Sequence, residues 1–535
     1  MSSTLFRGAT VVDGSGGDPF QADLTVVDGR IDRIAPSIGA FGELVIDARG
    51  LVLAPGFIDI HSHSDMTLFS HPALESKAYQ GVTLEVVGNC GLGAFPVASG
   101  REGELADFLK LHEFILPRNG VTWSDLEGYA ARINDQGLGI HVAPLVGHGA
   151  LRIATMGMDD RPPTLQERER MIRLLETALL QGAWGMSTGL IYPPGNYAAT
   201  DELIDLARTL AEHGALYASH IRSESEGLFP ALNEAITIGR ESGARVEVSH
   251  LKALGQSNRG KGRELLKLLA AARESGVDIA ADQYPYEASA TTLTAVVPAW
   301  AHAGGVAALL GRLRDPRLQG KLLEEIDREI ANREGPEGIM VGPCRSEQNR
   351  RFSGESLATI AAAWECTPAG GVIRLLSEEE GVVSALFFSM GEEDVTAILS
   401  DPGVAVGSDG HGLHAGLSAG DSTHPRSYGT FPRILGKYVR QEQLLPLAVA
   451  VRKMTAIPAG RLGMTHRGMV RPGYAADLVL FDPATIGDRA DYADPHRYSQ
   501  GVIHLLVAGE WVIREGALTG ERPGRLLRKG FDHAP

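Results

Sequence analysis

Histidine, cysteine and aspartate side chains recur at the ends of short apolar runs in this sequence of 535 residues. The run FIDI leads into His61 and His63, which are separated by one residue and so project from the same side of an extended chain. Two such imidazoles can bind one cation, but a His-x-His pair also occurs among ordinary polar residues at strand ends. Four further candidates follow other apolar runs, namely Cys90 in VVGNCG, His220 in YASHIR, His250 in VSHL and Asp409 in VGSDG.

Cysteine, histidine and carboxylate ligands together indicate zinc, because magnesium and calcium prefer oxygen ligands alone. A zinc ion lowers the pKa of a bound water toward about 7 and polarises a carbonyl group, which suits hydrolysis without a covalent intermediate. Asp409 would then act as general base toward the water and general acid toward a leaving nitrogen. A role as a simple metal ligand is the alternative for Asp409. The residue types therefore predict an enzyme, a zinc-dependent hydrolase.

Eight apolar strands are expected to position these residues. They begin near Phe57, Val82, His141, Ala183, Ala215, Val246, Val277 and Val404. Amphipathic segments such as PTLQERERMIRLLETALLQG alternate with them, a pattern typical of βα units. Eight parallel strands close a TIM-type (β/α)8 barrel, whose active sites lie at the carboxyl ends of the strands. All six candidate ligands follow strands at that end, and this convergence predicts one shared metal site in an α/β fold.

The rest of the chain is expected to form a small β domain and an insertion. Residues 1–54 and 466–535 read as short alternating strands with turns, so the two chain ends should pair into one β domain with a tail, while residues 55–465 form the barrel. The gap between the seventh and eighth strands exceeds one crossover and predicts an insertion at about 290–345, which can act as a lid. The basic stretch RPGRLLRK is expected to be a solvated tail.

Composition narrows the classes of partner and the compartment. A formal net charge of -16 disfavours nucleic acid and anionic membranes as partners, since both attract clustered lysine and arginine. The start MSSTLFRGAT lacks the pattern of a secretory signal, and no segment offers about 18 uninterrupted apolar residues for a membrane span. Three cysteines without paired spacing fit reduced thiols. These features predict a cytoplasmic protein.

The sequence resembles the D-aminoacylase, or N-acyl-D-amino-acid deacylase, family of the amidohydrolase superfamily along nearly its full length. The matching stretches are GFIDIHSHSD, GVTLEVVGNCG, YASHIRSE, VEVSHLKALG, DQYPYEASATTL, VGSDG and THPRSYGTFPRILG. The resemblance implies zinc-dependent hydrolysis of an N-acyl-D-amino acid to a carboxylate and a free D-amino acid. The partner it implies is therefore a small-molecule N-acyl amino acid.

The resemblance also implies two zinc positions that share Cys90. The tight position would use His220 and His250 as well, and the weaker one His61 and His63. Many relatives bridge two metals with a carboxylated lysine from the fourth strand, but here that strand reads AWGMSTGL and has no lysine. Cys90 resembles the thiolate that replaces this lysine in D-aminoacylases.

For the substrate, the resemblance implies that Asp409 is the catalytic acid/base and that Tyr192, Lys252, Ser289 and Arg426 recognise the amino-acid carboxylate. From the sequence alone, Lys252 and Arg426 fit structural ion pairs equally well. The stretch LTAVVPAW after the seventh strand contains no cation, so we expect a neutral, apolar side chain on the substrate. An arginine of the insertion, such as those in CRSEQNRRF, is the alternative source of positive charge.

Two other functions stay open at this stage. A cyclic-amide hydrolase or dipeptidase of the same superfamily would share the activation of water but not the acyl pocket. A non-catalytic scaffold is the second alternative, because some related barrels have lost their metal ligands, and retention of all six candidates argues against it. The sequence does not predict the acyl group, the strictness of the D preference or the oligomeric state.

Overall fold

The computed structural model describes residues 3–117, 119–416 and 424–531. Its centre is a parallel sheet of eight strands in the order β16-β12-β11-β10-β9-β8-β7-β6. The strands are β6 (Phe57–Asp59), β7 (Val82–Val87), β8 (His141–Gly147), β9 (Gly185–Gly189), β10 (Leu216–His220), β11 (Arg245–Val248), β12 (Ile279–Gln283) and β16 (Val404–Val406). A parallel bridge between Ser62 and Gly410 joins the segments that follow β6 and β16, so the barrel is nearly closed. The predicted α/β barrel is confirmed.

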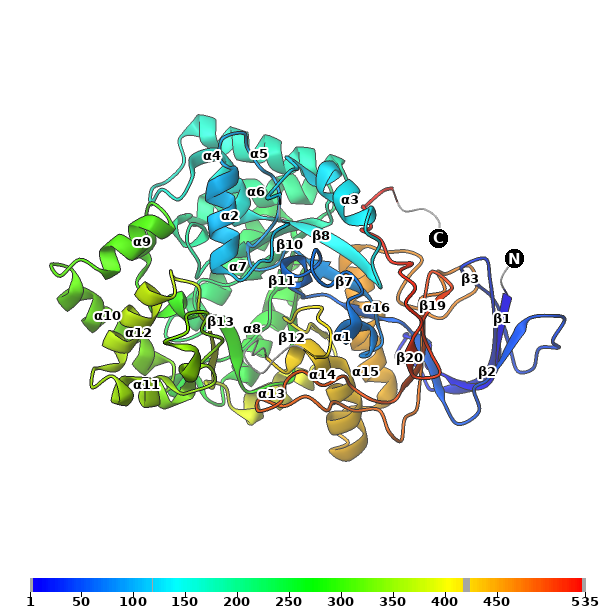
Figure 1. Ribbon diagram of the computed structural model, residues 1–535. Coiled ribbons are helices and arrows are strands. Elements are labelled where there is room, and N and C mark those ends of the chain that lie inside the picture. The colour runs from blue at the N-terminus through cyan, green and yellow to red at the C-terminus, as the bar shows by residue number, and fades with distance from the viewer. Residues whose placement is uncertain (1–2, 118, 417–423, 532–535) are drawn as a thin grey trace.

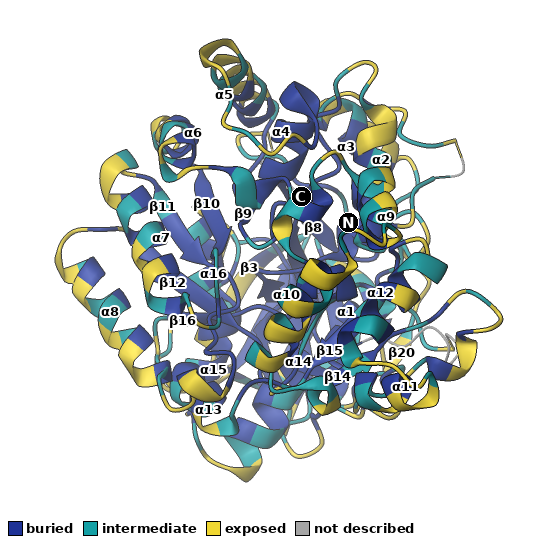
Figure 2. Cartoon of the chain, turned by 90° about the vertical axis from the view of Figure 1, so that its left-hand side faces the viewer, coloured by how far each residue is buried: buried dark blue, intermediate teal, exposed yellow. Residues whose placement is uncertain are grey.

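Helices cover the outside of the barrel, and their buried residues recur at helical spacing. In α6, the side chains of Leu203, Leu206 and Leu210 are buried against the sheet. Figure 2 shows exposed stripes on the outer faces of the helices around buried strands. The helices are α1 (Glu75–Ala78), α2 (Glu102–Leu111), α3 (Leu126–Asn134), α4 (His148–Met156), α5 (Leu165–Leu180), α6 (Thr200–Glu212), α7 (Leu228–Ser242), α8 (Gly262–Glu274), α13 (Glu392–Leu399), α14 (Arg426–Arg433), α15 (Leu447–Met454) and α16 (Ala456–Leu462). A π-helical turn, Ile434–Gln441, continues α14.

Strands from both chain ends form a second sheet beside the barrel (Figure 1). Its order is β20-β19-β18-β17-β5-β1-β2-β3, with β4 paired to β1. The strands are β1 (Ser3–Val11), β2 (Phe20–Val27), β3 (Arg30–Ala35), β4 (Leu44–Asp47), β5 (Val52–Pro55), β17 (Leu478–Phe481), β18 (Val502–Val507), β19 (Glu510–Arg514) and β20 (Ala517–Leu518). The antiparallel pairing of β5 with β17 joins the two ends, because Val52 faces Phe481 and Pro55 faces Leu478.

The segment between β12 and β16 forms a separate lobe on the side of the barrel away from the β sheet (Figure 1). Its elements are β13 (Ser289–Thr292), α9 (Val306–Leu313), α10 (Gln319–Asn332), β14 (Ile339–Val341), α11 (Leu357–Ala363), α12 (Pro368–Glu378) and β15 (Ser384–Phe387). Residues such as Leu322, Ile326 and Phe387 give this lobe an apolar core of its own. The packed unit continues past residue 345 because β15 pairs with both β13 and β14.

The expectation of a solvated tail for RPGRLLRK is wrong. Leu526 and Leu527 within it are buried, and the Leu527 amide donates a hydrogen bond of 2.7 Å to the carbonyl of Val142 in β8. The two leucines cover apolar surface at the base of the barrel, and this burial is favourable. The basic residues on either side of them made the stretch look solvent-exposed in the sequence. Within the described ranges, no helix has the length and apolar character needed to cross a membrane.

Candidate active site

The six candidate ligands all lie at the carboxyl ends of barrel strands, and all are buried. His61 and His63 follow β6, Cys90 follows β7, His220 ends β10, His250 follows β11 and Asp409 follows β16. Cys90, His250 and Asp409 have left-handed backbone conformations, with φ of 54°, 37° and 52°. A non-glycine residue in such a conformation carries strain of about 1–3 kcal/mol and persists where the surrounding structure imposes it, often at functional sites.

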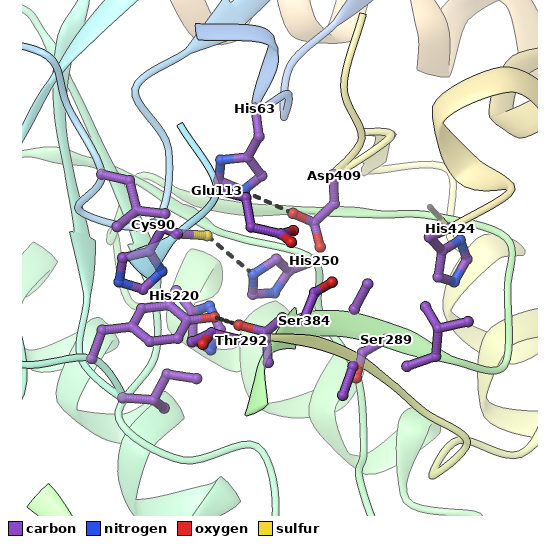
Figure 3. A pocket seen from close by; sticks show the side chains of 18 of the residues that line it. His63, Cys90, Glu113, His220, His250, Ser289, Thr292, Ser384, Asp409 and His424 are labelled. Atoms are coloured by element: carbon purple, nitrogen blue, oxygen red, sulfur yellow. Dashed lines mark hydrogen bonds and ion pairs between the residues drawn. The ribbon is translucent and has the colours of Figure 1, made fainter. Parts of the chain in front are cut away.

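One group of donor atoms comes from His61, His63, Cys90 and Asp409, of which the last three are labelled in Figure 3. Its donor atoms lie within 4.8 Å of one another. The Sγ atom of Cys90 is 3.4 Å from Nε2 of His61, and Oδ1 of Asp409 is 3.0 Å from Nε2 of His63. Burial on its own would raise the pKa of the Cys90 thiol, but His61 and His250 lower that pKa well below its ordinary value. Cys90 is thus held toward the thiolate, the form that binds metals.

A second group consists of Cys90, His220 and His250, whose donor atoms also lie within 4.8 Å of one another. The Sγ atom of Cys90 is 3.4 Å from Nε2 of His250. His220 is buried, and neither of its ring nitrogens has a hydrogen-bond partner in the part of the chain that the structure describes; the Oε2 atom of Glu224 lies 3.7 Å from its Nε2. Buried polar atoms without a hydrogen bond are unfavourable, so these nitrogens are available to a ligand such as a metal ion. Sulfur and nitrogen donors in this number fit zinc.

Two acidic residues that the sequence analysis did not single out hold the histidines in place. Asp282 in β12 accepts a hydrogen bond of 2.9 Å from the backbone N–H of His250, and its Oδ1 lies 3.3 Å from Nδ1 of His61. Glu224 Oε1 lies 3.0 Å from Nδ1 of His250 and 2.7 Å from Nζ of Lys252. A carboxylate on the second ring nitrogen orients a metal-binding histidine. Asp282 could have been found as an acid at a strand end, whereas Glu224 lies beyond its strand.

Replacing Glu224 with glutamine should weaken zinc binding about 10- to 100-fold, because His250 loses its carboxylate partner and Lys252 loses its counter-charge. Competition with a chromophoric chelator would measure the zinc affinity. Glu234→Gln is the matched control, since Glu234 also forms an ion pair, 2.8 Å from Arg222, but none with a candidate ligand. Equal zinc affinities in the two variants would show that Glu224 does not orient His250 for metal binding.

The four residues predicted to bind the substrate carboxylate line one cavity together with the candidate ligands other than His61. They are Tyr192, Lys252, Ser289 and Arg426. The cavity encloses a volume of about 110 Å³. Ser289 is the first residue of β13 in the inserted lobe, so that lobe forms part of the wall. The hydroxyl of Tyr192 is hydrogen-bonded at 2.7 Å to Oγ1 of Thr291 in the same strand.

Both cations in this set also form ion pairs within the protein. Nζ of Lys252 is bound to Glu224, and Nη1 of Arg426 lies 2.7 Å from Oδ2 of Asp409. Arg426 also donates from Nη2 to the carbonyl of Ala290 at 3.2 Å. The structural interpretation therefore holds for both cations, and their binding of substrate stays a prediction, since each also lines the cavity.

Sequence reasoning missed other residues that line the cavity, among them the ionisable residues His112, Glu113 and Arg333. His112 and Glu113 follow α2, and Arg333 follows α10, so none of them lies at a barrel strand end. The strand-end pattern that revealed the ligands carries no signal for these positions. Their placement depends on how the α2 region and the inserted lobe fold over the barrel mouth.

The sequence of this chain is similar to those of known proteins over nearly its full length. The sequence profile of the amidohydrolase family matches residues 44–513. The chain is 38% identical over 528 residues to N-acyl-D-aspartate deacylase of Alcaligenes xylosoxydans xylosoxydans, covering 98% of this chain and 95% of that protein. It is 36% identical to the D-aminoacylase of the same organism, covering 98% of this chain and 97% of the relative.

A solved structure is similar over the same length. N-acyl-D-glutamate deacylase from Bordetella bronchiseptica superimposes with a TM-score of 0.83 at 37% sequence identity, covering 98% of this chain and 99% of that one. That enzyme was crystallised with zinc and a phosphonate inhibitor that mimics the tetrahedral intermediate of its reaction. Two of these relatives are named for different acidic amino acids, and the third is named for D-amino acids in general. Their sequence identities to this chain are too similar to one another to discriminate among these substrates.

Proposed function

The chain belongs to the amidohydrolase family, within its N-acyl-D-amino-acid deacylases, and we propose on this basis that it hydrolyses the amide bond of N-acyl-D-amino acids. The products are a carboxylate and a free D-amino acid, and zinc is the cofactor. The observation that carries the proposal is the buried group of Cys90, His220 and His250 at the barrel mouth, beside Asp409. Such a site serves metal-assisted hydrolysis.

We infer that Cys90, His220 and His250 hold the principal zinc ion, and that His61 and His63 form a weaker position with the same cysteine. The orphaned ring nitrogens of His220 and the low pKa of Cys90 support the first assignment. A zinc ion held by these residues would supply a Lewis acid able to polarise the amide carbonyl and to lower the pKa of a bound water. The chain supplies everything else, namely the base, the acid and the groups that orient the substrate.

Asp409 is proposed as the group that moves the proton. Burial raises the pKa of Asp409, but Arg426 and His250 oppose burial and leave the pKa well below its ordinary value. The ionised carboxylate can accept a proton from the attacking water and then donate it to the amide nitrogen as the C–N bond breaks. The water oxygen ends in the carboxylate product and the proton ends on the amine, so the carboxylate of Asp409 is regenerated.

The α-carboxylate of the substrate is assigned to Tyr192, Lys252, Ser289 and Arg426. Arg426 supports this assignment best, since it faces the cavity while its ion pair with Asp409 fixes its orientation. Binding there would set the amide bond against Asp409 and orient one enantiomer. A planar guanidinium suits a carboxylate because two parallel hydrogen bonds define its direction.

The test is amine release from N-acetyl-D-methionine, N-acetyl-D-glutamate and their L enantiomers, with zinc quantified in the same preparation. We expect turnover of at least one D substrate by zinc-loaded protein and none of its L enantiomer. If the protein hydrolysed only hydantoins or only dipeptides, the assignment would change from a deacylase to a cyclic-amide hydrolase or a dipeptidase. Protein without zinc and without any activity would favour a scaffold.

A cytoplasmic location is part of the same proposal. A thiolate ligand at Cys90 has to remain reduced, and the cytosol keeps thiols in that state. The three cysteines of the chain are free, in agreement with a reducing compartment.

A further inference from the structure

Arg333 lies on the wall of the active-site cavity that the inserted lobe provides. It caps the carboxyl end of α10, and its guanidinium carbon lies 4.9 Å from the centre of the Phe387 ring in β15. Its Nε atom is shielded from solvent. Across residues 3–117, 119–416 and 424–531, its side chain has no hydrogen bond or ion pair. The guanidinium of this half-buried residue therefore packs on the ring of Phe387, and its buried Nε donor has no partner among the described residues.

The other cations of the cavity contrast with Arg333. Lys252 is paired with Glu224, and Arg426 is paired with Asp409. A buried donor without a partner destabilises a protein by about 1–3 kcal/mol, and by more when it is charged. An arginine held in this way at a substrate cavity is satisfied when an anionic ligand arrives, because its five N–H donors match a carboxylate.

A second anion is the ligand that would satisfy Arg333, because the proposed function already assigns the α-carboxylate to Tyr192, Lys252, Ser289 and Arg426. Of these, Ser289 begins β13 and Arg426 begins α14. Arg333 reaches the cavity from the turn after α10 and packs on Phe387 of β15, which pairs with Ser289 of β13, so Arg333 lies beside the α-carboxylate residues on the side of the inserted lobe. We propose that Arg333 binds a second carboxylate of the substrate, at the end of the D-amino-acid side chain, so that the enzyme prefers acidic N-acyl-D-amino acids.

Glu113 is the acidic group of the cavity that has no lysine or arginine bound to it within the described residues. Burial raises the pKa of Glu113, while Ser384 and Arg345 lower it less. A carboxyl group shifted toward its neutral form repels a bound carboxylate less and can donate a hydrogen bond to it. Glu113 is therefore compatible with an anionic side chain in this cavity.

This substrate class departs from the neutral side chain expected from the sequence. That expectation rested on the stretch LTAVVPAW, residues 293–300, which contains no cation. The stretch CRSEQNRRF is not the source of charge either, since none of its arginines lines the cavity. The cation comes from the turn after α10, where no strand or motif marks it.

The experiment compares kcat/KM for N-acetyl-D-glutamate, N-acetyl-D-aspartate, N-acetyl-D-methionine and N-succinyl-D-methionine in wild type, Arg333→Met and Arg333→Lys. We expect wild type to favour an acidic D-amino acid, and Arg333→Met to lower kcat/KM for it about 10- to 100-fold, since the side-chain carboxylate loses its half-buried charge partner. The loss for N-acetyl-D-methionine should be far smaller. Arg333→Lys should recover part of the preference, because lysine keeps the charge but not the bidentate geometry.

Arg328→Met is the matched control, because Arg328 lies about one turn earlier on α10, is exposed and pairs with Glu324. A wild-type preference for N-acetyl-D-methionine would overturn the inference whether or not the variants fold. A preference for N-succinyl-D-methionine would move the second carboxylate from the side chain to the acyl group. The proposed function fails separately, if zinc-loaded wild type hydrolyses none of the four substrates.

Discussion

Replacing Asp409 with asparagine should lower kcat by about 10²- to 10⁴-fold, the usual contribution of a positioned general acid–base group. Asparagine has nearly the same shape but cannot accept a proton from water or return it to the leaving nitrogen. The structure places Oδ1 of Asp409 3.0 Å from Nε2 of His63 and Oδ2 2.7 Å from Nη1 of Arg426. These contacts hold the carboxylate at the centre of the cavity, so the loss should appear in kcat more than in KM.

The same variant should keep its principal zinc ion. Asp409 belongs to the group with His61 and His63, and the group of Cys90, His220 and His250 does not need it. Zinc content and kcat measured on one preparation would separate an acid–base role from a role in holding the principal metal. A variant that loses zinc and activity together would instead make Asp409 a required ligand.

A control for Asp409→Asn lies at the opposite end of the same strand. Asp401 precedes β16 and accepts a hydrogen bond of 2.8 Å from the backbone N–H of Gly403. Residues at that face of a barrel serve stability, whereas those at the carboxyl face serve catalysis. Asp401→Asn should therefore shift the melting temperature by a few degrees at most and leave kcat near that of wild type. Equal losses of kcat in the two variants would show that the effect of Asp409→Asn is structural.

The barrel and its candidate ligands were accessible to sequence reasoning for one physical reason. Strands of a parallel barrel are buried on both faces, so each reads as a short apolar run, and the residue after the run lies at the active-site edge. His61, His220 and Asp409 follow or end such runs directly. The pattern placed the starts of two strands too early, since β9 and β12 each begin two residues after the predicted first residues, Ala183 and Val277.

Residues placed by tertiary packing could not be found in the same way. Glu224 and Arg333 reach the site from loops after β10 and α10, so no local periodicity marks them. Leu526 and Leu527 lie between basic residues. They are buried because they pack against the base of the barrel, a contact that the local sequence does not indicate. The charge of the substrate pocket depends on such residues, which is why the sequence predicted the reaction better than the substrate side chain.

The turns that follow the strands connect the fold to the chemistry. Cys90, His250 and Asp409 adopt left-handed conformations two or three residues after the ends of β7, β11 and β16. Anchors such as the 2.7 Å hydrogen bond from the Asp409 amide to the carbonyl of His61 hold these turns. The strain is tolerated because the barrel fixes both ends of each turn, and the result is that donors from five strands converge.

Cys90→Ala should have the largest effect on zinc, lowering it from about one ion per chain to a small fraction, with activity falling in parallel. Cys90 is the residue that both donor groups share, and it is their only thiolate. Its removal leaves buried imidazoles without an anionic ligand, so the affinity for a dication drops at both positions. Metal analysis by mass spectrometry and amine release on the same preparation would measure the two losses.

Cys344→Ala tests whether the loss is specific to Cys90. Cys344 is also buried, but it packs in the core of the inserted lobe, and burial raises the pKa of its thiol to about 11. It should keep its zinc and most of its activity, with stability reduced by about 1–2 kcal/mol for the small cavity. If Cys90→Ala folded, bound zinc and turned over substrate as wild type does, the thiolate would be dispensable. The imidazoles of His220 and His250 would then have to hold the metal with a ligand from water or substrate.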